Sequence, residues 1–284
     1  NYESFSLNQN LLAARLAAAP LEFSGAAASV ITLPTPEGQF DQFAYWESPI
    51  MAPELAAKFP EIETFVGRGI DDPTASVRFD LTPQGFHAQV LAPSGIYYVD
   101  PFYHLQADGP YISYFRTDYL SDANDTFSCL VQDVGSAHDE NDHDEDAPAS
   151  SAAGEVSSTS SSETVIGGDF SPLLAHGSQL RTYELAVAST GEYTTYHGGT
   201  VQLAMAAIVT TMNRVGGIYE DDIAARMELV ANNDQLVYTN SSTDPYSNNN
   251  GYSMLSQNQS TIDSVIGSAN YDIGHVFSTG GGGV

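Results

Sequence analysis

The sequence Leu-Arg-Thr-Tyr-Glu-Leu-Ala-Val-Ala, at positions 180–188, opens the stretch that decides the fold. It is expected to form a strand, and three further elements follow it in order. Apolar residues recur every three or four positions across 200–219, which predicts an amphipathic helix. Residues 226–230 and 271–277 are two more expected strands, and the last is mostly apolar, so we expect it in the interior of a sheet. This order is typical of an α/β domain.

Composition divides the 284 residues into three regions. Residues 1–132 hold short apolar runs separated by Pro and Gly, which predicts a β-rich domain. Residues 133–164 begin with an acidic run and continue as a Ser/Ala tract, so we expect a disordered linker that proteases cut easily. Residues 165–284 contain the α/β pattern.

Short elements are expected within both folded regions. Two helices are predicted at 8–18 and 53–59. In the third region, Gly216-Gly217 is expected to end the regular part of the long helix, and a second helix is predicted at 260–266, after a loop at 248–251. The expected strands of the first region lie at 27–33, 40–46, 64–66, 76–81, 86–91, 96–99 and 111–119.

The charge balance is strongly acidic. Eight Lys and Arg residues against 36 Asp and Glu residues give a formal net charge of −28. Such a surface repels nucleic-acid phosphates and anionic lipid, so we expect no nucleic-acid partner. No apolar run approaches 18 residues, so we expect no membrane span. The acidity fits a secreted protein or one from a salty environment, and the single cysteine, Cys129, excludes an intrachain disulfide framework.

The run Met-Asn-Arg-Val-Gly-Gly-Ile-Tyr at 212–219, followed by the strand at 226–230, resembles the reprolysin or adamalysin type of metzincin, a family of zinc peptidases. In that family a helix ending in an Asn…Val-Asn-x-Ile-Tyr pattern leads into the second strand of the sheet. Residues 271–280 are similar to the third strand and the loop after it. The resemblance is to a bacterial secreted precursor and covers nearly the whole chain, with 47–53, 69–75 and 85–88 falling in the propeptide.

The resemblance implies a fold and a function. The fold is an α+β, β-rich propeptide followed by an incomplete α/β metzincin-type catalytic domain, with a mixed twisted sheet and a long helix. The function is that of a secreted zinc metalloendopeptidase made as a zymogen, whose propeptide packs on its own catalytic domain and is released by cleavage in the linker. Its substrate is a polypeptide bound in the cleft, and zinc activates the attacking water.

The zinc motif of metzincins, His-Glu-x-x-His-x-x-Gly-x-x-His, does not occur in this sequence, which contains no His-Glu pair. The order of family elements places the zinc ligands beyond Val284. The chain begins at Asn1 and ends just after four glycines, so we expect a fragment truncated at both ends, without a visible signal peptide and inactive by itself.

Cys129 is the sharpest candidate site residue. In several metzincins an unpaired propeptide cysteine gives its thiolate to the zinc and blocks the water position, and Cys129 lies just before the linker, where such a switch would be. The alternative is a small buried side chain between Phe127 and Leu130, since free cysteines are often buried. No flanking basic residue indicates a lowered thiol pKa.

Gly282, Gly283 and Val284 are candidates for the substrate-binding rim. In related enzymes the next strand forms the upper rim of the cleft and binds extended substrate through its backbone. Glycines before that strand would let the chain turn and approach a ligand closely. A flexible turn is the alternative interpretation.

The histidines form no metal-binding pattern in the sequence. His138 and His143 lie in the acidic run at a spacing of five, which does not place them on one helical face, so we expect them in solvent. His275 is expected in a core or facing a cleft, and His197 in a loop before the long helix. His87 and His104 are expected to stand alone, without a cluster of polar side chains around them.

Two other functions fit the same residues. The chain could be a non-enzymatic secreted module for binding or adhesion, in which this α/β fold has lost its zinc helix. It could also contain a stand-alone inhibitor built from residues 1–132. Paired histidines in the sequence that follows position 284 would favour the enzyme.

Overall fold

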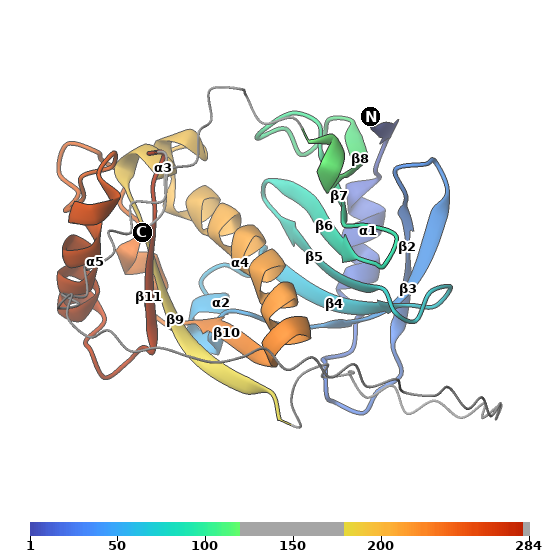
Figure 1. The fold of residues 1–284 in the computed structure, drawn as a ribbon, viewed down its shortest axis with the longest axis horizontal. Coiled ribbons are helices and arrows are strands. Elements are labelled where there is room, and N and C mark those ends of the chain that lie inside the picture. Colours follow the sequence, from blue (N-terminus) through green and yellow to red (C-terminus); the bar gives the residue numbers. More distant parts are fainter. Residues whose placement is uncertain (120–178, 281–284) are drawn as a thin grey trace, which may run out of the picture. The chain divides into compact units, whose positions relative to one another are not determined.

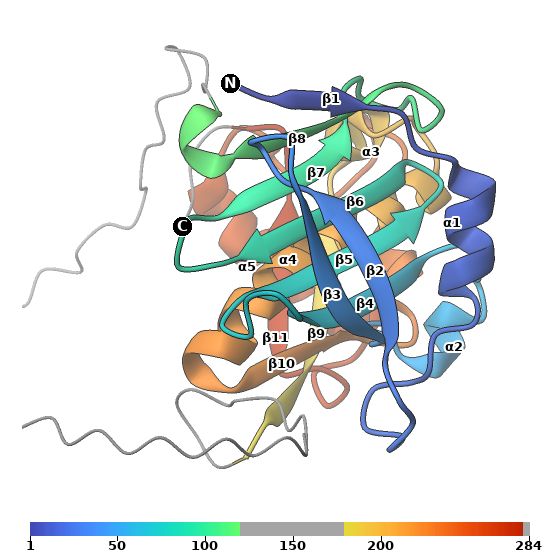
Figure 2. The ribbon, with the colours of Figure 1, turned by 90° about the vertical axis from the view of Figure 1, so that its right-hand side faces the viewer.

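Eight antiparallel strands form the amino-terminal sheet, in the order β1-β8-β7-β6-β5-β4-β3-β2. The structure is a computed structural model, and it describes residues 1–119 and 179–280. The sheet is visibly curled (Figure 2). The strands are β1 (Glu3–Phe5), β2 (Ser29–Pro34), β3 (Phe40–Glu47), β4 (Glu63–Gly69), β5 (Ser76–Thr82), β6 (Gly85–Leu91), β7 (Tyr97–Pro101) and β8 (Tyr111–Phe115).

The two faces of this sheet differ in chemistry because side chains alternate along each strand. On β5, Val77 and Phe79 lie on the apolar face, whereas Arg78 and Asp80 lie on the opposite face. The apolar face packs against Leu16 of helix α1 (Gln9–Leu16), which is 2% exposed. The core on this face consists of Leu16, Ile31, Leu33, Phe43, Tyr45, Phe65, Ala75, Val77, Phe79, Phe86, Ala88, Val90, Tyr97, Val99 and Tyr111.

Three parallel strands form the second sheet, in the order β10-β9-β11. They are β9 (Arg181–Ser189), β10 (Ala225–Leu229) and β11 (Ile273–Phe277). Helix α4 (Val201–Ile223) connects β9 to β10, and the Thr200 side chain caps it by accepting from Leu203 N at 3.2 Å. Figure 1 shows α4 between this sheet and the strands around β5. Further helices are α2 (Pro53–Ala56), α3 (Gly191–Tyr196) and α5 (Gly251–Val265), with two short 3-10 turns, η1 (Arg116–Asp118) and η2 (Asn233–Leu236).

One hydrophobic core contains side chains from both ends of the chain. The segment around α2 (Pro53–Ala56) contributes the fully buried Leu55 to a cluster that also contains Leu185 of β9 and Ile208 of α4. Burying an aliphatic side chain of this size contributes about 1.5–3 kcal/mol. The other amino-terminal members of this cluster are Ile50, Met51, Phe59 and Ile62. Residues 1–119 and 179–280 therefore belong to one compact unit.

The segment before α2 also pairs with the edge of β10. Leu229 N donates to the carbonyl oxygen of Ile50 at 2.7 Å, and Ala52 N donates to the carbonyl oxygen of Leu229 at 2.8 Å. Met51 and Leu229 are thus partners in a parallel bridge. Backbone groups at that edge of the three-stranded sheet are satisfied by the amino-terminal region.

Apart from the helix expected at 260–266, the predicted strands and helices are confirmed, with shifts of a few residues at most ends. Residues 111–119 were expected as one strand, but β8 ends at Phe115 and η1 follows. β1 and α3 were not predicted from the sequence. Both are short, and neither contains enough apolar residues to show a strand-like or helix-like repeat.

Three predictions about the carboxyl-terminal region were wrong. Helix α4 runs through Gly216 and Gly217 to Ile223, because packing against β5 holds it. Helix α5 begins at Gly251 and not near 260, since Asn250 caps it by accepting from Ser253 N at 3.0 Å. Within residues 179–280, β11 pairs with β9 alone and lies at an edge, so the interior strand is β9.

The three described strands of this second sheet are all parallel. The mixed sheet predicted for this incomplete domain is therefore not what the described residues form, because both strand pairs in the sheet are parallel. Among the helices that the structure describes, none is long and apolar enough to cross a membrane.

Candidate functional site

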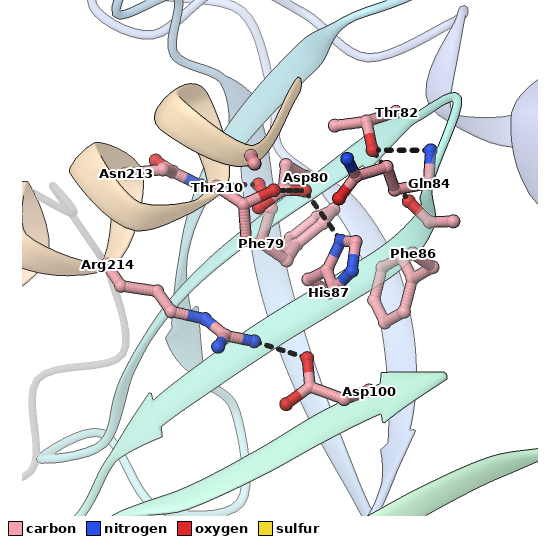
Figure 3. Close-up of polar contacts among 12 residues, drawn as sticks. Phe79, Asp80, Thr82, Gln84, Phe86, His87, Asp100, Thr210, Asn213 and Arg214 are labelled. Carbon is pink, nitrogen blue, oxygen red and sulfur yellow. Dashed lines mark hydrogen bonds and ion pairs between the residues drawn. The ribbon is translucent and has the colours of Figure 1, made fainter. Parts of the chain in front are cut away.

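One face of α4 packs against the polar face of the amino-terminal sheet (Figure 3). At the centre of this contact is Asp80 of β5, which is 1% exposed. One of its carboxylate oxygens accepts from the Thr210 hydroxyl at 2.8 Å and lies 3.1 Å from Nδ1 of His87 on β6. The Thr210 hydroxyl of α4 and the His87 imidazole of β6 thus both contact the buried carboxylate of Asp80.

Two further helix side chains contact the sheet one turn along. Asn213, which is 1% exposed, donates from Nδ2 to the carbonyl oxygen of Phe79 at 2.9 Å. Arg214 forms an ion pair with Asp100 of β7, and its guanidinium lies 5.0 Å from the centre of the Tyr98 ring. Positions 210, 213 and 214 share one helical face because they are three to four residues apart.

An ionic chain continues the contact toward the end of α4. Arg78 of β5 pairs with Glu220, which also pairs with Arg226 at 2.6 Å, and Arg226 pairs with Glu22 at 2.9 Å. Burial opposes ionisation of Glu220, but the two guanidinium groups together hold the pKa of its carboxyl below the ordinary value. Arg78 Nη1 also donates to Ser48 Oγ at 3.0 Å. The two positive and two negative side chains therefore neutralise one another, and the Ser48 hydroxyl accepts a further hydrogen bond from Arg78.

Gly217 allows the close approach of β5 and α4. A Cβ atom at Gly217 would lie 2.7 Å from Cγ of Arg78, closer than real contacts permit. At Gly216 a Cβ atom would meet nothing within 4 Å. The second glycine is therefore a requirement of the contact, whereas the first is not.

Several polar atoms at this contact are buried without a hydrogen-bond partner among residues 1–119 and 179–280. They are Asp80 Oδ2, Gln89 Oε1, Asn213 Oδ1 and Arg214 Nε. Each such group costs about 1–3 kcal/mol of desolvation. These unpaired atoms make the polar contact less favourable than it would be with all its hydrogen bonds formed.

A comparison with protein families identifies the part of the chain that contains α4. Residues 179–283 match the family model described as metallo-peptidase family M12B, reprolysin-like. Residues 179–283 are reprolysin-like. No curated protein matches the chain.

The family match covers only one of the two regions that make this contact. The reprolysin-like segment begins immediately before β9 and includes α4, β10, α5 and β11. The eight-stranded sheet and α2 lie outside the match. The buried contact is therefore made between a reprolysin-like segment and a region that the family model does not include.

Most site residues predicted from the sequence lie outside the described residues. These are Cys129, His138, His143, Gly282, Gly283 and Val284, together with the predicted linker at 133–164. The cysteine switch, the substrate rim and the linker therefore stay predictions.

Among the histidines that the structure describes, His197 lies as expected, whereas His275, His87 and His104 do not. His275 lies on the edge strand β11 and is exposed, not buried in a core. His197 follows α3 as its carboxyl-terminal cap and precedes α4, which confirms the expected loop. His87 and His104 do not stand alone, because His87 contacts Asp80 and His104 contacts His197. Asp80 lies on the strand next to that of His87, and His197 is 93 positions from His104. Sequence spacing alone does not indicate either contact.

The described residues do not fit the zinc centre of a peptidase. Within residues 1–119 and 179–280, no group of three or more His, Cys, Asp or Glu side chains is placed to hold a metal ion. Metalloprotease zinc sites use three protein ligands and leave a position for water. No catalytic step is therefore assigned to residues of the described structure.

Proposed function

We propose that this chain is the precursor portion of a secreted zinc metalloendopeptidase. Residues 1–132 act as the propeptide-like domain, and residues 165–284 are the first part of the catalytic domain. The observation that carries the proposal is the position of α4. This helix belongs to the reprolysin-like segment, and strands from outside the family match cover its polar face.

The contact supports a propeptide that assists folding of the catalytic segment. Leu55 and Ile50 complete a core that includes Leu185 and Ile208, so the reprolysin-like segment alone would expose part of its apolar surface. The same segment satisfies backbone groups of β10 through Leu229. Folding the two regions together avoids these costs.

Release of the propeptide is proposed to follow cleavage in the linker at 133–164. The polar half of the contact favours a dissociable partner, because it contains buried atoms such as Asp80 Oδ2 that gain hydrogen bonds in water. Cys129, which precedes the linker, is proposed to hold the precursor inactive by donating its thiolate to the metal.

The metal ligands are proposed to come from a segment that follows Val284, as the order of metzincin elements implies. When bound, zinc would lower the pKa of its water and polarise the peptide carbonyl. The residues of this chain would supply the first strands of the sheet and the helix beneath the site. Polypeptide is the proposed substrate.

The two rival functions differ in whether they leave the apolar side chains of this contact exposed. A stand-alone inhibitor built from residues 1–132 would expose Ile50, Met51 and Leu55 when free, since these side chains are buried against the reprolysin-like segment. That exposure disfavours the inhibitor. A non-enzymatic binding module has no such conflict and is separated from the enzyme by the test below.

The test uses the protein expressed from its complete gene. We expect hydrolysis of a quenched fluorescent peptide library after cleavage in the 133–164 segment, loss of hydrolysis with 1,10-phenanthroline and recovery with added zinc. The uncleaved precursor serves as the control and is expected to be inactive. No hydrolysis by the cleaved, zinc-loaded protein would contradict the proposal and favour the binding module.

A parallel variant tests the cysteine switch. Cys129→Ser is expected to raise the peptidase activity of the uncleaved precursor, because serine does not provide a thiolate for the metal. If mutant and wild-type precursors are equally inactive, Cys129 has no switching role.

A further inference from the structure

A histidine pair also joins the two regions, beside Gln84, whose side chain donates to the His197 carbonyl oxygen. His104 follows β7 and is exposed, and His197 ends α3 and is half-buried. Nε2 of His104 lies 3.5 Å from Nδ1 of His197. Tyr196 stacks on His104 with ring centres 4.5 Å apart, and Tyr193 packs against His197 at 4.4 Å. The two imidazoles are thus held edge to edge by aromatic neighbours.

The distance between the two nitrogens is long for a hydrogen bond. Such bonds to nitrogen donors are usually about 2.7–3.2 Å. Two imidazole nitrogens bound at about 2.0–2.1 Å to one tetrahedral ion are separated by roughly 3.3–3.4 Å. The 3.5 Å spacing of His104 and His197 is closer to the separation of two ligands than to that of a hydrogen-bonded pair.

The surroundings of the two rings also suit metal binding. Burial, aided by the neighbouring His104, lowers the pKa of His197 to about 4, and burial lowers the pKa of His104. Across the described residues, no other side chain is hydrogen-bonded to either ring, so the ligating nitrogens have no competing partner.

The backbone beside the pair is unusual. Leu105, next to His104, has a φ angle of 61°, which side-chain-bearing residues seldom adopt. A strained backbone persists where surrounding structure holds it, and such positions gather at functional sites. Leu105 thus marks a constrained turn beside His104.

We propose that His104 and His197 form a binding site for one divalent transition-metal ion, such as Zn²⁺, Ni²⁺ or Cu²⁺. Imidazole suits these ions, and no third protein ligand is present among the described residues, so water would complete the coordination. The ion would tie the loop after β7 to the end of α3, and thus residues 1–119 to the reprolysin-like segment. This site does not depend on peptidase activity and is separate from the expected zinc motif.

The test is Cu²⁺ and Zn²⁺ binding to the full chain near pH 7. Electron paramagnetic resonance of the Cu²⁺ form is expected to show two imidazole nitrogens in wild type and one in His104→Asn and in His197→Asn. Each of these variants should bind roughly tenfold or more weakly, because one of two direct ligands is lost. Zn²⁺ should also raise the unfolding midpoint of wild type more than that of either variant.

Two control variants locate the bound ion. His275→Asn removes an exposed histidine outside the pair and should bind as wild type does. The double variant His138→Asn/His143→Asn removes the histidines of the acidic run and should keep the two-nitrogen signal. If that double variant loses binding while His104→Asn keeps it, or if wild type shows a single nitrogen, the proposed site is wrong.

Discussion

Arg78 of β5 forms an ion pair with Glu220 of α4, and the Arg78 side chain is only 4% exposed. The two residues are 142 positions apart in the sequence. Glu220 belongs to the reprolysin-like segment, whereas Arg78 lies outside it. Because Glu220 also pairs with Arg226, one carboxylate stands between two guanidinium groups. This carboxylate is therefore one of the groups that join the two regions, together with the core around Leu55.

Substitution of Glu220 should weaken the fold strongly. Glu220→Gln leaves Arg78 buried without its counter-charge, and breaking a buried pair in this way typically costs about 3–5 kcal/mol. We expect a loss near the lower end of this range, since Arg78 still donates to Ser48 and Arg226 still pairs with Glu22. Urea unfolding followed by fluorescence measures the change in the free energy of unfolding.

Lys58→Ala is the matched control for this prediction. Lys58 pairs with Asp234 at 2.7 Å and also joins the two regions, but its side chain is 39% exposed. Exposed ion pairs contribute less than about 1 kcal/mol. Equal losses in Lys58→Ala and Glu220→Gln would show that burial of the Arg78 pair has no special effect.

The pH dependence of stability should report the same carboxylate. Burial opposes ionisation of Glu220, yet Arg78 and Arg226 keep its pKa below the ordinary value of 4.5. A carboxyl group with a lowered pKa in the folded state stabilises the protein above its unfolded pKa and loses this effect as the pH falls through the folded value. The stability difference between wild type and Glu220→Gln should therefore be constant down to about pH 5 and shrink below pH 4.5.

Urea midpoints of both proteins between pH 7 and about pH 3 check this expectation. Other carboxyl groups titrate in both proteins, so the difference between the two curves isolates Glu220. A difference that grows as the pH falls would mean that the pKa of Glu220 is raised in the folded protein.

Neighbouring glycines of α4 provide a steric test of the contact. Gly216→Ala should stabilise the protein by about 0.5–1 kcal/mol, because alanine favours helix and the added methyl meets open space. Gly217→Ala should destabilise it by about 1–3 kcal/mol, because the methyl would collide with Cγ of Arg78. Thermal or urea unfolding of both variants decides between these signs. If both alanines stabilise equally, β5 does not approach α4 at Gly217.

Much of the fold follows from sequence periodicity. The alternation along Val77, Arg78, Phe79 and Asp80 predicts a strand with one apolar face, and that strand is β5. The three- and four-residue recurrence of apolar residues predicts α4, although the helix extends past Gly217. Local patterns of this kind are readable because burial repeats with the period of the element.

The polar contact could not be predicted in the same way. Alternation indicates that Arg78 and Asp80 face away from the apolar core, and the usual interpretation of such a face is exposure to solvent. The structure buries both under α4, because Thr210, Asn213 and Glu220 provide their partners. Those partners lie more than 120 residues away, and a single sequence carries no signal of such pairing.

The histidine pair shows the same limit at a smaller scale. His104 and His197 are 93 positions apart and neither belongs to a recognisable motif. The two rings come together only in the folded chain, where His104 follows β7 and His197 ends α3.

The association of residues 1–119 with the reprolysin-like segment is tested most directly by cutting the chain between them. A site for a specific protease, introduced within 133–164, allows complete cleavage of the folded protein, and size-exclusion chromatography at micromolar concentration then measures the association. We predict that both fragments elute together at the position of the uncut chain, because they share the core around Leu55 and the ion pair of Arg78 with Glu220. Elution of two separate, folded fragments would contradict the shared unit, in which a cut at 133–164 is needed for release of the propeptide but does not by itself separate the two regions at this concentration.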